Sequence, residues 1–102
     1  MTAFEHGEAL IAEFKLCLDP ASRALDLSSE VGEICKEILK GTQYGSQGFQ
    51  TTPNLELEMG DVYFSLLMMA ASVNVDLEIA LEKSVKKMRD RLARSGQVGS
   101  KS

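Results

Sequence analysis

The chain has 102 residues, of which 44% are hydrophobic and 25% are charged, a balance that indicates one globular domain and excludes a disordered chain. The formal net charge of −4 argues against a nucleic-acid-binding domain, because such domains carry an excess of basic residues for the phosphates. The two cysteines lack metal-ligand spacing, which favours reduced thiols and a cytoplasmic location.

Apolar residues recur with a helical period along four segments, at about 3–18, 20–40, 53–73 and 77–94. Each segment opens with residues that can satisfy the free backbone N–H groups of a first helical turn. These residues are Thr2 with Glu5 as a capping box, Asp19 before Pro20, Thr52 before Pro53, and Asp76. The pattern therefore predicts four helices.

The expected helix ends also carry specific residues. Gly41 fits a C-terminal cap for the second helix, and Asn74 can adopt the left-handed conformation that closes the third. Residues 41–51 are polar and glycine-rich, which indicates a loop. Because no segment alternates as a strand does, we predict an all-α fold, with one domain over 1–94 and a flexible tail over 95–102.

The run at 62–73 is apolar on nearly every face, so its helix needs cover on all sides. A chain this short offers three partner helices at most, and we expect a four-helix bundle that is completed by oligomerisation. The same run is too short to span a bilayer, and acidic residues interrupt the apolar stretch at the N-terminus. We therefore expect a soluble protein without a signal peptide or a membrane partner.

Two short stretches repeat one pattern of acid, apolar residue, glycine and acid: EVGE at 30–33 and EMGD at 58–61. On a helical wheel the acids of the first stretch border the apolar stripe of the second helix, and Glu37 lies on the same flank. Acids three residues apart share one helical face, so two such pairs on neighbouring helices can face each other. Converging carboxylates repel unless a cation joins them, and Mg²⁺ prefers oxygen ligands. The pattern therefore predicts a metal site, although a single pair of this kind is more often a solvated helix face.

Gly32 and Gly60 stand inside these two stretches. A glycine in a helix interior costs about 1 kcal/mol relative to alanine. We interpret both glycines as allowing the two helices to approach closely, so that the acid pairs meet.

The stretch L-x-S-E-V-G-E at 27–33, followed after a loop by E-x-G-D at 58–61, resembles the metal-binding signature of the all-α nucleoside triphosphate pyrophosphohydrolases of the MazG type. The resemblance implies that Glu30, Glu33, Glu58 and Asp61 bind Mg²⁺, with Mn²⁺ as a substitute. It also implies hydrolysis of nucleoside triphosphates to the monophosphate and pyrophosphate, by a homodimer or homotetramer. Ser29 and Leu57 stand at positions that are often acidic in the family, which leaves the number of ions open.

The chemistry expected from this resemblance is metal-assisted hydrolysis of a phosphoanhydride. Glu33 and Glu37 are both candidates for the general base. Substrate phosphates also attract cations, and Lys83, Lys87 and Arg91 form a ladder at i, i+4 and i+8 on the fourth helix. These three basic residues are equally compatible with a role in complementing the helix dipole.

The sequence leaves the nucleobase open. It also leaves three alternatives to a general house-cleaning enzyme of the nucleotide pool: a relative restricted to dUTP, dCTP or phosphoribosyl-ATP, a non-catalytic helical oligomerisation module, and a domain that binds a nucleotide without cleaving it.

Overall fold

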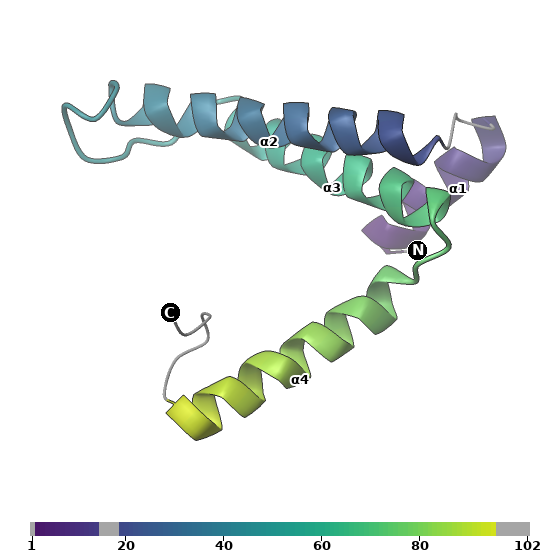
Figure 1. Ribbon diagram of the computed structural model, residues 1–102. Helices are drawn as coiled ribbons and strands as arrows, with labels where there is room; N and C mark the ends of the chain where they lie inside the picture. The colour runs from purple at the N-terminus through teal and green to yellow at the C-terminus, as the bar shows by residue number, and fades with distance from the viewer. Residues whose placement is uncertain (1, 15–18, 96–102) are drawn as a thin grey trace.

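A computed structural model describes residues 2–14 and 19–95, and all of its regular structure is helical (Figure 1). The helices are α1 (Ala3–Phe14), α2 (Pro20–Gly41), α3 (Leu55–Ser72) and α4 (Leu77–Ser95). The prediction of an all-α fold with four helices is confirmed. The predicted end of the first helix at 15–18, and the tail beyond residue 95, lie outside the described residues.

Helices α2 and α3 lie side by side as an antiparallel hairpin, and α1 crosses the hairpin where α2 begins and α3 ends (Figure 1). The small core lies at this crossing, where Ile11 of α1 meets Leu67 and Met68 of α3. Gly7 permits the close approach of α1, because a Cβ atom there would overlap the side chain of Leu67. The other end of the hairpin carries the loop between α2 and α3.

Three of the predicted helix starts are confirmed by side-chain hydrogen bonds. Thr2 and Glu5 exchange hydrogen bonds of 3.0 and 3.1 Å between side chain and backbone, as a capping box requires. Asp19 accepts the backbone N–H of Ser22 at 3.0 Å, with proline at the start of the helix. Asp76 accepts two N–H groups in the first turn of α4, at 2.9 and 3.2 Å.

The loop between α2 and α3 differs from the prediction at both of its ends. Gly41 is the last residue of α2 and not its left-handed cap; the positive φ angles belong to Gln43, Tyr44 and Gly45, at 47°, 58° and 88°. The predicted capping role of Thr52 is also wrong, since α3 begins after Asn54 without a side-chain cap. Asn74, by contrast, has the expected left-handed conformation, with a φ of 57°.

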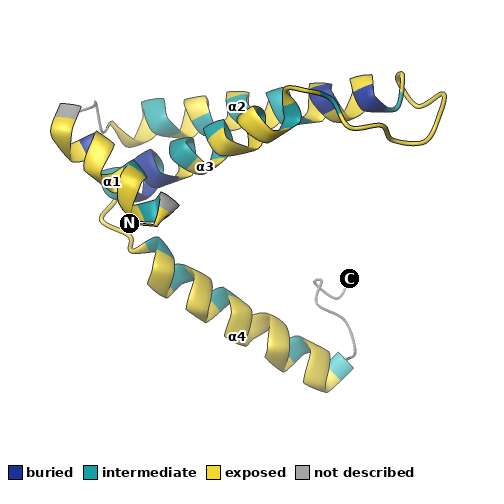
Figure 2. Ribbon diagram, turned by 180° about the vertical axis from the view of Figure 1, so that it is seen from behind, coloured by how far each residue is buried: buried dark blue, intermediate teal, exposed yellow. Residues whose placement is uncertain are grey.

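Helix α4 leaves the hairpin, because the chain bends by 105° between α3 and α4. None of its residues is buried, and Figure 2 shows it exposed along most of its length. The radius of gyration is 16.6 Å, whereas a compact domain of this length has a value of roughly 13 Å. One chain therefore does not form a closed four-helix bundle by itself. The apolar side chains along α4, which form its apolar seam, are largely uncovered, as are Val31 and Ile38 on α2.

No single helix of the described chain is both long enough and apolar enough to cross a membrane. Taken as one bent pair, α3 and α4 pass that test by length and composition.

Candidate metal centre

Three acidic side chains converge across the α2–α3 hairpin. Glu30 extends from α2, and Glu58 and Asp61 extend from the first two turns of α3. One carboxylate oxygen from each lies within 4.8 Å of the other two, and all three residues are half-buried. Glu58 and Asp61 share a face because they stand three residues apart on one helix. These three residues are called the acidic cluster below.

The electrostatics of the acidic cluster disfavour three free negative charges. The pKa of Glu58 is raised above its ordinary value of 4.5, first by burial and then by the negative charges of its neighbours Asp61, Glu33, Glu30 and Glu37. Either a proton or a cation relieves this repulsion. Carboxylate oxygens at this spacing are the ligand type that Mg²⁺ and Mn²⁺ take, so the residues present fit such an ion.

Glu33, the fourth predicted ligand, lies beside the acidic cluster and not within it. Its side chain is 47% exposed, and Lys36 Nζ stands 3.9 Å from its Oε2. Its charge still reaches Glu58, where it contributes to the raised pKa. The structure thus brings together three of the four predicted ligands, and Glu33, which is half-buried like them, lies outside this group.

Glu37, the second candidate for the general base, is buried, with 6% of the residue exposed. Its Oε2 accepts the hydroxyl of Thr52 at 2.6 Å, and its Oε1 accepts Lys40 Nζ at 3.4 Å. The Thr52 hydroxyl, assisted by Lys40, lowers the pKa of Glu37, although burial opposes them. A carboxylate with a lowered pKa and two protein donors is a weak proton acceptor.

The three basic residues predicted to meet phosphates all lie on α4, which points away from the hairpin (Figure 1). Lys83 and Lys87 are exposed, and Arg91 is half-buried. Within one chain the fold does not bring them to the acidic cluster. Their contact with phosphates therefore stays a prediction.

The interpretation of Gly32 and Gly60 as points of close helix approach is wrong. A Cβ atom at either position would meet no atom within 4 Å, so both glycines face open space in the single chain. The glycine of α2 that does allow a close approach is Gly41, where a Cβ atom would stand 2.5 Å from Gln50 O and 2.6 Å from the ring of Phe49, both in the loop.

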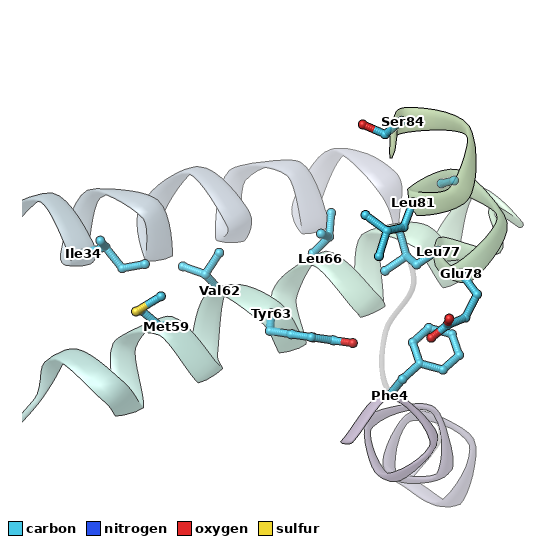
Figure 3. Close-up of a pocket in the computed structure, with 11 residues that line it drawn as sticks. Phe4, Ile34, Met59, Val62, Tyr63, Leu66, Leu77, Glu78, Leu81 and Ser84 are labelled. Atoms are coloured by element: carbon cyan, nitrogen blue, oxygen red, sulfur yellow. The ribbon is translucent and has the colours of Figure 1, made fainter. Parts of the chain in front are cut away.

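An apolar groove of about 540 Å³ opens between the outer face of α3 and the start of α4 (Figure 3). Met59, Tyr63 and Leu66 line it from α3, and Leu77 and Leu81 line it from α4. Ile34 of α2 and Val62 of α3 also line the groove and lie one helical turn from Glu30 and Glu58, so the groove begins beside the acidic cluster. Sequence reasoning did not locate this groove, although the apolar faces of the third and fourth predicted helices were a signal for it.

Comparison with known proteins adds one finding. Residues 19–94, which include α2, α3 and nearly all of α4, match the family model of the MazG nucleotide pyrophosphohydrolase domain. No curated protein and no solved structure matches the chain.

Proposed function

The chain belongs to the MazG nucleotide pyrophosphohydrolase family, and from this premise we propose that it hydrolyses nucleoside triphosphates to the monophosphate and pyrophosphate with Mg²⁺. The observation that supports the proposal is the convergence of Glu30, Glu58 and Asp61 from two helices onto one half-buried point. Burial and the negative charges of the neighbouring acids raise the pKa of Glu58 there, which favours the binding of a cation.

In the proposed mechanism the acidic cluster holds the ion, and the chain supplies the proton acceptor. Bound Mg²⁺ would neutralise the triphosphate and lower the pKa of a bound water. Glu33 stands next to the cluster with its side chain 47% exposed, and its ion pair with Lys36 is long, at 3.9 Å. We assign to Glu33 the role of general base, because its carboxylate is available to take a proton from water.

The proposed enzyme works as an assembly of at least two copies. The single chain exposes 7581 Å², whereas a compact monomer of 11.1 kDa exposes roughly 5,700 Å². Part of this excess is the uncovered apolar surface of α3 and α4, which a second copy can bury. We propose that a second copy covers the apolar groove, where Tyr63, Leu66 and Leu81 are exposed in the single chain.

Assembly also explains how the basic residues of α4 could reach the substrate. Lys83, Lys87 and Arg91 recur at every fourth residue and so follow one side of α4. In the assembly we propose that this side of α4 from one copy faces the acidic cluster of the other. There the three residues would bind the phosphates of the substrate, leaving the cluster to bind the ion.

The test is a pyrophosphate-release assay over a panel of nucleoside triphosphates, with and without Mg²⁺ or Mn²⁺. We expect metal-dependent release, which Asp61→Asn reduces by about 100-fold or more because a ligand is lost. Glu56→Gln is the matched control, since Glu56 is an exposed acid in the same part of α3. Restriction to one nucleotide would identify a specialised relative. Metal-dependent nucleotide binding without product, or no effect of metal at all, would contradict the proposed activity.

A further inference from the structure

Among the described residues Glu37 is the one buried charged residue. Burying a carboxylate is costly unless its oxygens are hydrogen-bonded. Here each oxygen has a donor: the Thr52 hydroxyl at 2.6 Å and Lys40 Nζ at 3.4 Å. Thr52 lies 15 residues away in the chain, in the segment that leads into α3. The hydrogen bond therefore ties the last turns of α2 to the start of its partner helix.

The Glu37–Thr52 hydrogen bond is one tether between α2 and the returning chain, and a second tether lies one helical turn further along α2. The N–H of Gln50 donates to Gly41 O at 2.7 Å. A Cβ at Gly41 would stand 2.5 Å from Gln50 O and 2.6 Å from the ring of Phe49. The returning chain therefore lies directly against the helix at this glycine.

The distance between the two tethers is nearly the same along α2 and along the returning chain. Residues 37 and 41 are one helical turn apart, a rise of roughly 6 Å. Residues 50 and 52 are two residues apart, which spans roughly 6.6 Å in an extended chain. The segment 50–52 can thus lie along α2 in one register, with both tethers made at once.

The position of Thr52 sets where α3 begins. Pro53 follows it and restricts the backbone, and the N–H of Leu55 donates to Thr52 O at 3.3 Å. A slip of α3 by one residue would shift its side chains by about 1.5 Å along the axis and turn them by about 100°. Glu58 would then leave the face that meets Glu30.

We propose that Glu37 is a positioning residue: through its hydrogen bond with Thr52 it holds α3 in the register that completes the acidic cluster. Glu37 does not act as the general base, because both of its oxygens already have protein donors and its side chain is 8% exposed. The inference rests on the proposed function in one respect, which is that the acidic cluster is the ion-binding site.

The test uses the full chain and titrates it with Mn²⁺ alone. Thr52→Val removes the hydroxyl at nearly constant shape, and we expect it to weaken Mn²⁺ binding by about 10-fold, as loss of a supporting hydrogen bond does at metal sites. Thr52→Ser keeps the hydroxyl and should restore wild-type affinity. Thr51→Val is the matched control, because the side chain of Thr51 is exposed. Unchanged Mn²⁺ affinity in Thr52→Val would overturn the inference.

Two further measurements separate this inference from the proposed function. Hydrogen exchange of the amides at 55–61 should quicken in Thr52→Val and not in Thr52→Ser, whether or not an ion binds. If the wild type binds no Mn²⁺, the proposed metal site fails, and the exchange result alone decides the positioning role. A Glu37→Gln variant that loses turnover at unchanged Mn²⁺ affinity would make Glu37 the general base and refute the positioning role.

Discussion

Helices α2 and α4 are both amphipathic in sequence, yet the α2–α3 hairpin and α4 differ in how far their side chains are covered. In the hairpin two helices cover each other, Glu37 is buried, and three acids are half-buried at the acidic cluster. Helix α4 has no buried residue, and Leu81 in its apolar seam is 62% exposed. An amphipathic pattern therefore states which face is apolar, but it does not state which chain covers that face.

The charges of the two regions differ in the same way. The acids of the hairpin gather at one point, where burial and mutual repulsion raise the pKa of Glu58. On α4 opposite charges pair locally, as Lys86 and Asp90 do at 3.1 Å, with both side chains exposed. Exposed pairs of this kind contribute little stability. The acids of the hairpin therefore repel one another, whereas Lys86 and Asp90 of α4 neutralise each other at its solvated face.

If the two regions meet only between copies, two defective variants should complement each other. Asp61→Asn damages the acidic cluster, and Lys87→Ala damages the basic side of α4. In a statistical mixture half of the dimers are mixed, and each mixed dimer has one intact site when Lys87 serves its partner's cluster. We expect about one quarter of wild-type pyrophosphate release after the two variants are unfolded and refolded together. Activity no higher than the mean of the separate variants would show that each chain uses its own α4.

A charge in the apolar groove should separate the copies. Leu81→Glu places a carboxylate on the surface that the second copy covers, and burial of an unpaired charge is strongly unfavourable. We expect light scattering to show a mass near that of a single chain. Leu25→Glu is the control, since Leu25 is 73% exposed and does not line the groove. An unaltered mass in Leu81→Glu would mean that the copies associate through another surface.

Glycine-to-alanine substitutions should have a smaller effect, which is a change in the free energy of unfolding. Gly41→Ala should lower the free energy of unfolding by about 1–3 kcal/mol, because its methyl group collides with Gln50 and Phe49. Gly60→Ala and Gly32→Ala meet no atom within 4 Å and should each raise it by about 0.5–1 kcal/mol through helix propensity. Urea unfolding measures all three variants. Destabilisation by Gly60→Ala would mean that a second copy packs against that glycine.

The smallest expected effect is a pH dependence at Glu58. Its pKa in the folded chain is raised above 4.5, so its favourable contribution is present below pH 4.5 and is lost as pH rises through the raised pKa. In chelator-treated protein, Glu58→Gln should therefore match the wild type in stability near pH 4 and exceed it near pH 7. Urea unfolding across this pH range measures the difference in the free energy of unfolding between Glu58→Gln and the wild type. A difference that stays constant with pH would show that the charge of Glu58 is not repelled in the folded state.

Local signals predicted the parts of the fold that depend on neighbours in the chain. The hydrogen bonds of Asp19, Asp76 and the Thr2–Glu5 box join groups within three residues, so sequence spacing was sufficient. Thr52 was misassigned because its hydroxyl has a distant partner that competes with the nearby helix end.

The acidic cluster was predicted in part for a related reason. The spacing of Glu58 and Asp61 fixes them on one face, and the apolar stripe of α2 indicated that Glu30 borders its partner helix. Glu33 lies about 60° further round α2, and only the observed packing of the helices shows that this places it outside the group of three converging carboxylates. Gly32 and Gly60 were misread because a glycine indicates available space without indicating which neighbour uses it.

The double attachment of the α2–α3 loop has a consequence for its tip. Gln50 and Thr52 fix the returning chain to α2, and the turn before them is fixed as well, because the N–H groups of Gln43 and Tyr44 donate to Lys40 O and Leu39 O. Lengthening such a tip adds only a small closure entropy and leaves the anchored base in place. A reporter peptide inserted at Gly48, which is exposed between the bonded turn and the anchor at Gln50, would therefore leave the distance between the helices intact.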